Sequence, residues 1–211
     1  MALSKRYLYL LISLALLCLY FPINRLMGGG LNLETTLDTY IPILPVFSIP
    51  YLLFIPFWIF ALVWSTWKME KRLFKSFMIA LISVISTSMI FYVIFPTYVD
   101  RTLQTGKDWP TVILNSIYSH DKAYNAFPSN HVYMTTLIAL FWSRWFPHFK
   151  WALAGSVILV VLSILFTGQH YLVDPLGGIF LAWMGYRFGL FMEGLPSIQQ
   201  PALAYFRDIR Q

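Results

Sequence analysis

Long apolar runs alternate along the chain with short segments that carry most of its charges. A helix that crosses a bilayer needs roughly 20 mostly apolar residues. Six segments come close to this length, and they are residues 7–23, 51–67, 76–95, 129–146, 151–167 and 175–192. The run that holds the second segment begins at residue 41, and its prolines indicate an irregular entry before the helix. The pattern predicts an all-α, polytopic membrane protein with six transmembrane helices.

Composition supports a membrane protein. Of the 211 residues, 58% are hydrophobic and 11% are charged, whereas a soluble domain carries about 25% charged residues. No internal repeat or low-complexity segment interrupts the pattern, so we expect a single membrane-embedded domain over residues 1–211. Cys18 is the only cysteine, which excludes an intrachain disulfide and a cysteine-based metal cluster.

Lysine and arginine indicate how the chain is oriented, because they gather on the cytoplasmic side of a membrane. With the N-terminus inside, the outer segments hold only Arg25, Arg101, Lys107 and Lys122 of the 15 basic residues. The first helix lacks a signal-peptidase pattern after it and is expected to stay uncleaved. We therefore predict a multi-pass protein of the cell (inner) membrane with both termini cytoplasmic. The net charge of +6 reflects this topology, and no nucleic-acid partner is expected.

Four ionisable residues fall at the predicted outer ends of the helices: Arg101, His131, His170 and Asp174. Such residues beside a bilayer are costly and mark functional sites by default. Histidine exchanges protons near neutral pH and also serves as a nucleophile. Because the four residues share one membrane depth, a helical bundle can bring them together. The sequence predicts an enzyme site on the periplasmic or extracellular side.

Two motifs carry the resemblance to a known family. Phe127-Pro128-Ser129-Asn130-His131 is followed 39 residues later by His170, and Asp174 follows after three more residues. In this order, with Arg101 upstream, they resemble the type-2 phosphatidic acid phosphatase (PAP2) superfamily. The amino-acid sequence at residues 95–101 and 124–129 is most similar to the inositol phosphorylceramide synthase-like branch. The resemblance covers about residues 95–178, the core motifs, and implies a PAP2-like helical bundle.

The resemblance implies a role for each motif residue. His170 would attack phosphorus and form a phosphohistidine, and Asp174 would orient its ring. His131 would protonate the leaving oxygen and later deprotonate water or an alcohol. Phosphate oxygens would be bound by the remaining candidates, Arg101, Ser129, Asn130 and Lys107.

Three positions depart from the family pattern. Ile94 and Ile164 stand where the pattern has a lysine and an arginine, and Thr102 replaces a proline. Two cationic phosphate ligands are therefore missing, and Lys107 or Lys122 would have to substitute. On this reasoning an Ile164→Arg change should improve turnover of simple lipid monoesters.

Structural interpretations of the same residues stay open. Asp174 before Pro175 has the form of an N-cap, and Ser129 and Asn130 could cap the fourth helix. A histidine pair with Asp174 could ligate zinc, but no fourth ligand of similar quality is present, so neither a metal nor a cofactor is expected.

The predicted function is hydrolysis of a lipid phosphate or diphosphate through a phosphohistidine, with a lipid phosphate as substrate and membrane lipids as neighbours. One alternative is a phosphotransferase that moves a phospho-head group to a hydroxyl acceptor. Another is a non-catalytic relative of the same fold, although such a protein has no need of all three of His131, His170 and Asp174.

Overall fold

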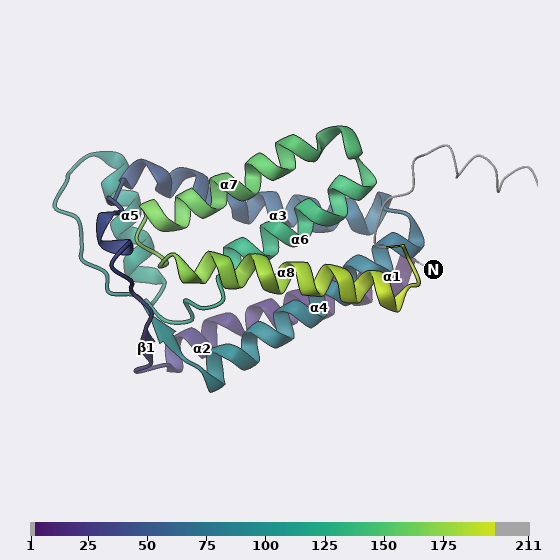
Figure 1. Cartoon of the computed structure of the whole chain (residues 1–211), viewed down its shortest axis with the longest axis horizontal. Helices are drawn as coiled ribbons and strands as arrows, with labels where there is room; N and C mark the ends of the chain where they lie inside the picture. The colour runs from purple at the N-terminus through teal and green to yellow at the C-terminus, as the bar shows by residue number, and fades with distance from the viewer. Residues whose placement is uncertain (1–2, 197–211) are drawn as a thin grey trace, which may run out of the picture.

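The computed structural model describes residues 3–196, and its long helices run side by side along an elongated bundle (Figure 1). These helices are α1 (Leu3–Cys18), α2 (Tyr20–Leu26), α3 (Ser48–Lys68), α4 (Lys71–Ile94), α6 (Asn130–Trp145), α7 (Lys150–Phe166) and α8 (Val173–Met192).

Each apolar run found in the sequence forms helix within a few residues of its predicted bounds. The first run is broken at Leu19 into α1 and α2, and the proline-rich entry before α3 holds a short 3-10 helix, Pro45–Phe47. The sequence therefore located the helices of the bundle correctly.

Four segments within residues 3–196 are long and apolar enough to cross a membrane: Leu3–Leu26, Pro45–Lys68, Lys71–Ile94 and Pro147–Phe166. The other two predicted spans, α6 and α8, are helical but are not among them. α6 has only 16 residues and carries several polar ones, and α8 contains Asp174 and four glycines. A multi-pass membrane protein is thus supported, while the number six stays a prediction.

The interior of the bundle lies between α4, α6 and α8. α8 packs against both α4 and α6, and α6 also packs against α7. Aromatic rings fill this core, as where Phe77 and Phe141 lie 5.0 Å apart between ring centroids. Some polar side chains inside it are paired across helices: the Ser88 hydroxyl bonds that of Tyr133, and the Trp58 indole donates to Thr135.

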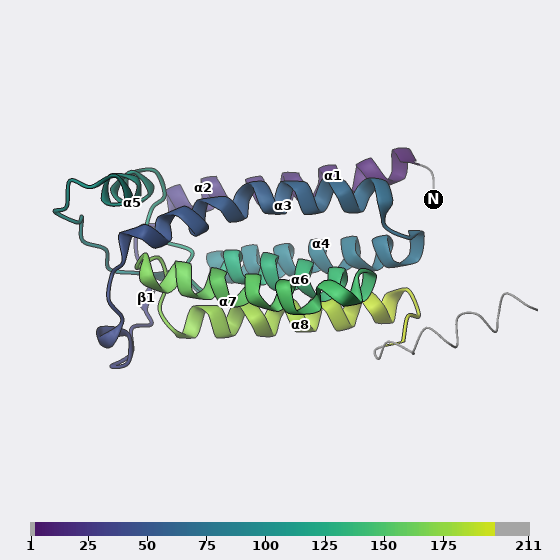
Figure 2. The same cartoon turned by 90° about the horizontal axis from the view of Figure 1, so that it is seen from above.

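The two strands and the helix α5 lie at one end of the bundle, opposite the N-terminus (Figures 1 and 2). Here β1 (Leu31–Asn32) pairs in parallel with β2 (Thr97–Tyr98), and the helix α5 (Trp109–His120) packs against the 3-10 helix Pro45–Phe47 and α3. α5 was not predicted from the sequence. Because the α3–α4 and α6–α7 connections lie at the opposite end, the segments predicted as outer and inner are separated in space.

Candidate active site

A polar cavity lies at the end of the bundle that carries α5 and β1. It is lined by Tyr20, Tyr51, Arg101, Asp121, Tyr124, Asn125, Ala126, Asn130, His131, Gln169 and His170. Arg101, His131 and His170 are far apart in sequence, so the fold brings together the residues that the motifs singled out. Asn130 also lines the cavity, at the first position of α6.

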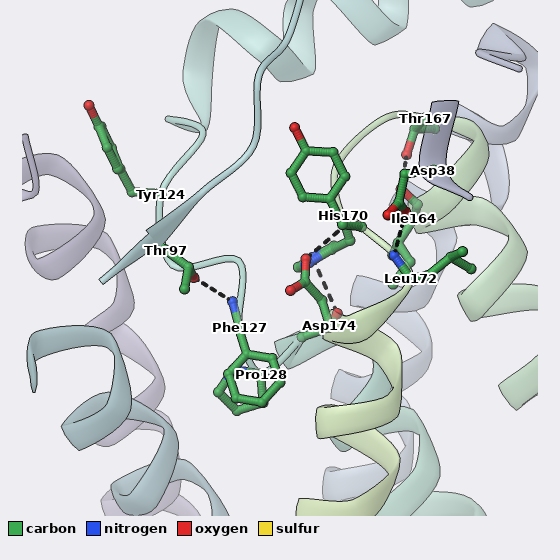
Figure 3. A network of polar contacts seen from close by, with 12 residues as sticks. Asp38, Thr97, Tyr124, Phe127, Pro128, Ile164, Thr167, His170, Leu172 and Asp174 are labelled. Atoms are coloured by element: carbon green, nitrogen blue, oxygen red, sulfur yellow. Dashed lines mark hydrogen bonds and ion pairs between the residues drawn. The ribbon is translucent and has the colours of Figure 1, made fainter. Parts of the chain in front are cut away.

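His170 and Asp174 form a tight pair at the start of α8 (Figure 3). His170 Nδ1 lies 3.1 Å from Asp174 Oδ2, and the same oxygen accepts a 3.0 Å bond from the backbone N–H of Tyr171. Asp174 is completely buried. Since the carboxylate can only accept, Nδ1 carries the hydrogen and the lone pair of Nε2 faces away from Asp174.

The alternative interpretation of Asp174 as the N-cap of the sixth helix is wrong. α8 begins at Val173 after Leu172, which has no side-chain cap, and Asp174 sits inside the first turn. Its carboxylate turns back to the loop before the helix. That loop is fixed from its other side by Asp38, whose Oδ1 accepts a 2.7 Å bond from the Leu172 N–H (Figure 3).

Ser129 occupies the N-cap position of α6, as expected, but its side chain makes no capping bond. Its Oγ lies 3.2 Å from Nε2 of His170 instead. Because Nε2 is the acceptor nitrogen of that ring, the Ser129 hydroxyl donates to it. The residue thus contacts the nitrogen that would react.

Two glycines allow α8 to approach the Ser129 segment closely. A Cβ on Gly178 would lie 2.9 Å from the Ser129 carbonyl oxygen, and one on Gly177 would overlap the Phe127 ring. The backbones are then joined by a 3.2 Å bond from the Ser129 N–H to the Asp174 carbonyl. This approach sets the distance between Ser129 and His170.

The segment before Ser129 is held by the rest of the bundle. The Phe127 N–H donates to Thr97 Oγ1 at 2.8 Å, and the Tyr92 hydroxyl donates to the Pro128 carbonyl at 2.8 Å (Figure 3 shows the first). The motif is therefore anchored to β2 and α4.

His131 has quite different surroundings from His170. Its ring lies 4.3 Å from that of Tyr51 and 5.1 Å from that of Trp58, both on α3. The rings of His131 and His170 are 6.4 Å apart. Within residues 3–196 the ring nitrogens of His131 have no hydrogen-bond partner, and the imidazole packs against aromatic rings.

Arg101 reaches the polar cavity from the loop after β2. Its Nη1 donates to the Asp121 carbonyl at 3.1 Å, and its guanidinium lies 5.5 Å from the Tyr118 ring centroid. Its Nε is buried and has no partner among the described residues. The guanidinium therefore keeps a donor available for a bound anion.

The two lysines proposed as substitutes are not part of the cavity lining. Lys107 is exposed in the loop before α5, and Lys122 donates through Nζ to the Arg25 carbonyl at 2.8 Å. Ile164 does not line the cavity either. Its side chain is fully buried in an apolar cluster with Tyr51 and Val132. Arg101 is thus the one basic side chain lining the cavity within residues 3–196.

Several lining residues carried no recognised motif. Asp121 follows α5 and accepts a bond from the Tyr20 hydroxyl at 3.1 Å. Burial raises the pKa of Asp121, and the charge of Arg101 partly offsets this rise. Gln169 is 1% exposed, and both its amide nitrogen and its amide oxygen lack partners within the described chain. The only signal for these two residues was their place next to motif residues or at a predicted outer end.

An apolar groove of about 620 Å³ opens beside the polar cavity. Its walls come from α1 and α2, α3, α5 and α6, and include Leu14, Leu17, Leu52, Ile55, Ile59, Leu62, Ile113, Ile117 and Met134. His131, Asp121, Tyr20, Tyr51 and Asn130 line both spaces, whereas His170 lines only the polar cavity of the two. The groove therefore reaches the site on the His131 side.

No group of three or more histidine, cysteine, aspartate or glutamate side chains within residues 3–196 is arranged to hold a metal ion.

Comparison with known proteins identifies a family and one relative. The family model described as PAP2 superfamily matches residues 30–188. The inositol phosphorylceramide synthase catalytic subunit aur1 of Schizosaccharomyces pombe is 34% identical over 76 residues, which is 36% of this chain and 18% of the relative. The chain thus matches less than a fifth of that relative's length. No solved structure matches the chain.

Proposed function

The chain belongs to the PAP2 superfamily, and from this premise we propose that it transfers a phosphoryl group from a lipid phosphate through a phosphohistidine. The observation that carries the proposal is the contrast within one cavity: His170 is oriented by Asp174, while His131 faces it with free ring nitrogens. Water or an alcohol would accept the group.

In the first step Nε2 of His170 attacks phosphorus, so that a P–N bond forms and the P–O bond to the lipid alcohol breaks. Protonated His131 gives its proton to the departing oxygen. Asp174 stabilises the positive charge that develops on His170, as the carboxylate of a catalytic triad does. The Ser129 hydroxyl, which bonds Nε2 in the absence of substrate, turns to a phosphate oxygen.

In the second step His131 removes a proton from water or an alcohol, whose oxygen attacks phosphorus. The P–N bond breaks and His170 is regenerated. Arg101 binds the equatorial oxygens throughout, since negative charge on them persists in both steps. Asn130, at the N-terminus of α6, adds its backbone N–H.

The apolar groove supports a lipid as the phosphate carrier. An in-line displacement places the leaving alcohol opposite the attacking nitrogen, on the side of His131. His131 lines the groove and His170 does not, so an apolar chain in the groove would bring its oxygen to the acid. We place this site at the outer face of the cell membrane, with six spans and cytoplasmic termini.

Transfer to a hydroxyl acceptor is the second candidate, and the similarity to the inositol phosphorylceramide synthase subunit favours it. After the leaving alcohol departs, the groove is free for a second lipid alcohol, which would approach His131 along the same path. Hydrolysis and transfer then share the first step. They differ only in whether water or a lipid alcohol attacks the phosphohistidine in the second step.

The test is turnover of ³²P-labelled phosphatidic acid and polyprenyl phosphates by the purified protein, with and without added lipid alcohols. We expect released phosphate or labelled acceptor from the wild type and neither from His170→Ala. Equal turnover by the two proteins would refute the phosphohistidine.

A further inference from the structure

The polar cavity holds more hydrogen-bond acceptors than a phosphate can use. Phosphate oxygens accept hydrogen bonds, so Arg101, Ser129 and protonated His131 suit them. A carboxylate and amide oxygens do not, and the cavity is lined by Asp121, Gln169, Asn125 and Asn130. The amide oxygens of Gln169, Asn125 and Asn130 are buried without partners among residues 3–196. Gln169 also has an unpaired amide nitrogen, so the lining as a whole, with Asp121 as an acceptor, suits a ligand group that both donates and accepts, as a hydroxyl does.

Asp121 is not required to hold its own loop. The side chain of Asn24 does so, because its Nδ2 donates to the carbonyls of Lys122 and Tyr124 at 3.0 and 2.9 Å. Its Oδ1 accepts from the Lys122 N–H at 3.1 Å. The loop therefore has three bonds in which the Asp121 carboxylate takes no part.

Asp121 does not neutralise Arg101 by direct contact either. The guanidinium donates to the carbonyl oxygen of Asp121, not to its carboxylate. The Tyr20 hydroxyl is the one hydrogen-bond donor to the carboxylate within the described chain. A carboxylate has about four lone-pair positions, so it retains capacity for further donors.

The position of Asp121 indicates which part of a ligand it would meet. Asp121 and His131 both line the boundary between the polar cavity and the apolar groove, and Gln169 lies in the cavity behind them. A lipid alcohol in the groove would present its reacting hydroxyl to His131. A second hydroxyl on the neighbouring carbon would then lie at the same boundary, where Asp121 is.

We propose that Asp121, assisted by Gln169, binds a second hydroxyl group of the acceptor alcohol and so selects amphiphilic acceptors with neighbouring hydroxyls over simple alcohols and water. This inference rests on the proposed function, because it concerns the second step of that reaction. It assigns the selection of acceptor to a residue outside the PAP2 motifs.

The experiment compares 1,2-dodecanediol with 1-dodecanol as acceptors for the phosphoryl group of ³²P-labelled phosphatidic acid. Both have the same chain and one primary hydroxyl, so only the second hydroxyl differs. The readout is the partition of label between dodecyl product and inorganic phosphate. Since this partition follows formation of the phosphoenzyme, a change in the first step does not alter it.

We expect the wild type to favour the diol, and Asp121→Ala to lower that preference about 10- to 100-fold, as for hydrogen bonds to a charged group. Gln169→Ala should lower it about 5-fold, as for a neutral bond. The control Glu34→Ala removes an exposed carboxylate that does not line the cavity, and it should keep the wild-type preference. Equal partition with both acceptors in the wild type would overturn the subsite while leaving the phosphohistidine intact.

If no lipid is turned over, the proposed function fails and the partition of label cannot be measured. The binding of the two alcohols, measured as thermal stabilisation, then tests the subsite. His170→Ala protein should be stabilised against heat more by the diol than by the alcohol, and His170→Ala/Asp121→Ala protein equally by both. Equal stabilisation of the single variant would overturn the subsite by itself.

Discussion

His170 and His131 line the same cavity, but the fold holds them in different ways. His170 contacts a carboxylate through one nitrogen and a hydroxyl through the other. The ring of His131 packs against those of Tyr51, Trp58 and His170, and neither of its nitrogens is hydrogen-bonded within residues 3–196. A nucleophile needs one fixed tautomer, whereas an acid that later acts as a base must exchange protons freely. The contact of His170 with Asp174 meets the first need. The second depends on the bound phosphate, whose negative charge would favour protonation of His131.

The largest effect should separate the two histidines. His170→Ala removes the attacking nitrogen, so we expect loss of turnover with every substrate. His131→Ala should abolish turnover of an alkyl phosphate but retain much of it with a 4-nitrophenyl ester, because nitrophenolate departs without a proton. Rates with both esters measure this. If the nitrophenyl ester rescued His170→Ala and not His131→Ala, the roles would have to be exchanged.

Asp174→Asn tests what orients His170. The change keeps the size of the side chain but removes the acceptor that fixes Nδ1–H, and a comparable loss in a catalytic triad costs about 10⁴ in rate. We expect the variant to fold and to lose rate by about this factor. The measurement is the single-turnover rate at which an acid-labile phosphoenzyme forms. A drop below tenfold would mean that Ser129 and the loop suffice to orient the ring.

The apolar cluster that holds Ile164 is the target of Ile164→Arg. The family pattern has an arginine here, but Ile164 is fully buried with Tyr51 and Val132, so the added charge would enter an apolar cluster. An uncompensated buried charge costs about 3–5 kcal/mol. Instead of the gain in turnover expected from the motif, we predict a large fall in melting temperature. Ile164→Met serves as the control, since an apolar swap of similar volume is tolerated.

Arg101 and Lys107 test which cation serves the phosphate. Loss of one donor that stabilises a transition state costs about 10²–10³ in rate, and we expect this for Arg101→Ala. Lys107 is exposed outside the cavity, so Lys107→Ala should alter kcat/KM less than about twofold. Steady-state kinetics on one lipid phosphate compare them. A comparable loss for both would show that the loop before α5 closes over the substrate.

The sequence predicted the helices well because long apolar runs leave few alternatives. It missed α5, which has only 12 residues, although Asp108 caps it and Pro110 lies in its first turn. Both signals are local and were available. The division of α1 from α2 at Leu19 also had a local signal, because Pro22 has no N–H to donate to the Cys18 carbonyl and its ring crowds that carbonyl.

The motifs pointed to His131, His170, Asp174, Arg101 and Ser129, and the fold brings these residues together. The rest of the site depends on packing. Tyr51 meets His131 because α3 lies against α6, and Tyr20 meets Asp121 because α2 lies under the loop after α5. Contacts between segments so far apart in the chain leave no regular spacing in the sequence from which they could be predicted. The same limit applies to Ile164, whose burial follows from the face that α7 turns to α6.

The smallest effect concerns the two carboxylates of the site, of which Asp174 is paired with a histidine and Asp121 with a tyrosine. Burial raises the pKa of Asp121 above its value in the unfolded chain, so folding favours the protonated form. Below the unfolded pKa of about 3.9 both states are protonated and the group has no effect. As the pH rises through the folded pKa, the buried charge progressively destabilises the fold. Asp121→Asn should therefore melt at a higher temperature than the wild type at pH 7 and show no such gain near pH 3.5. Melting curves at the two pH values, with Glu34→Gln as an exposed control, measure the difference. A stability loss at pH 7 would show that the ionised carboxylate supports the fold, and Asp121 would then be a structural residue like Asn24.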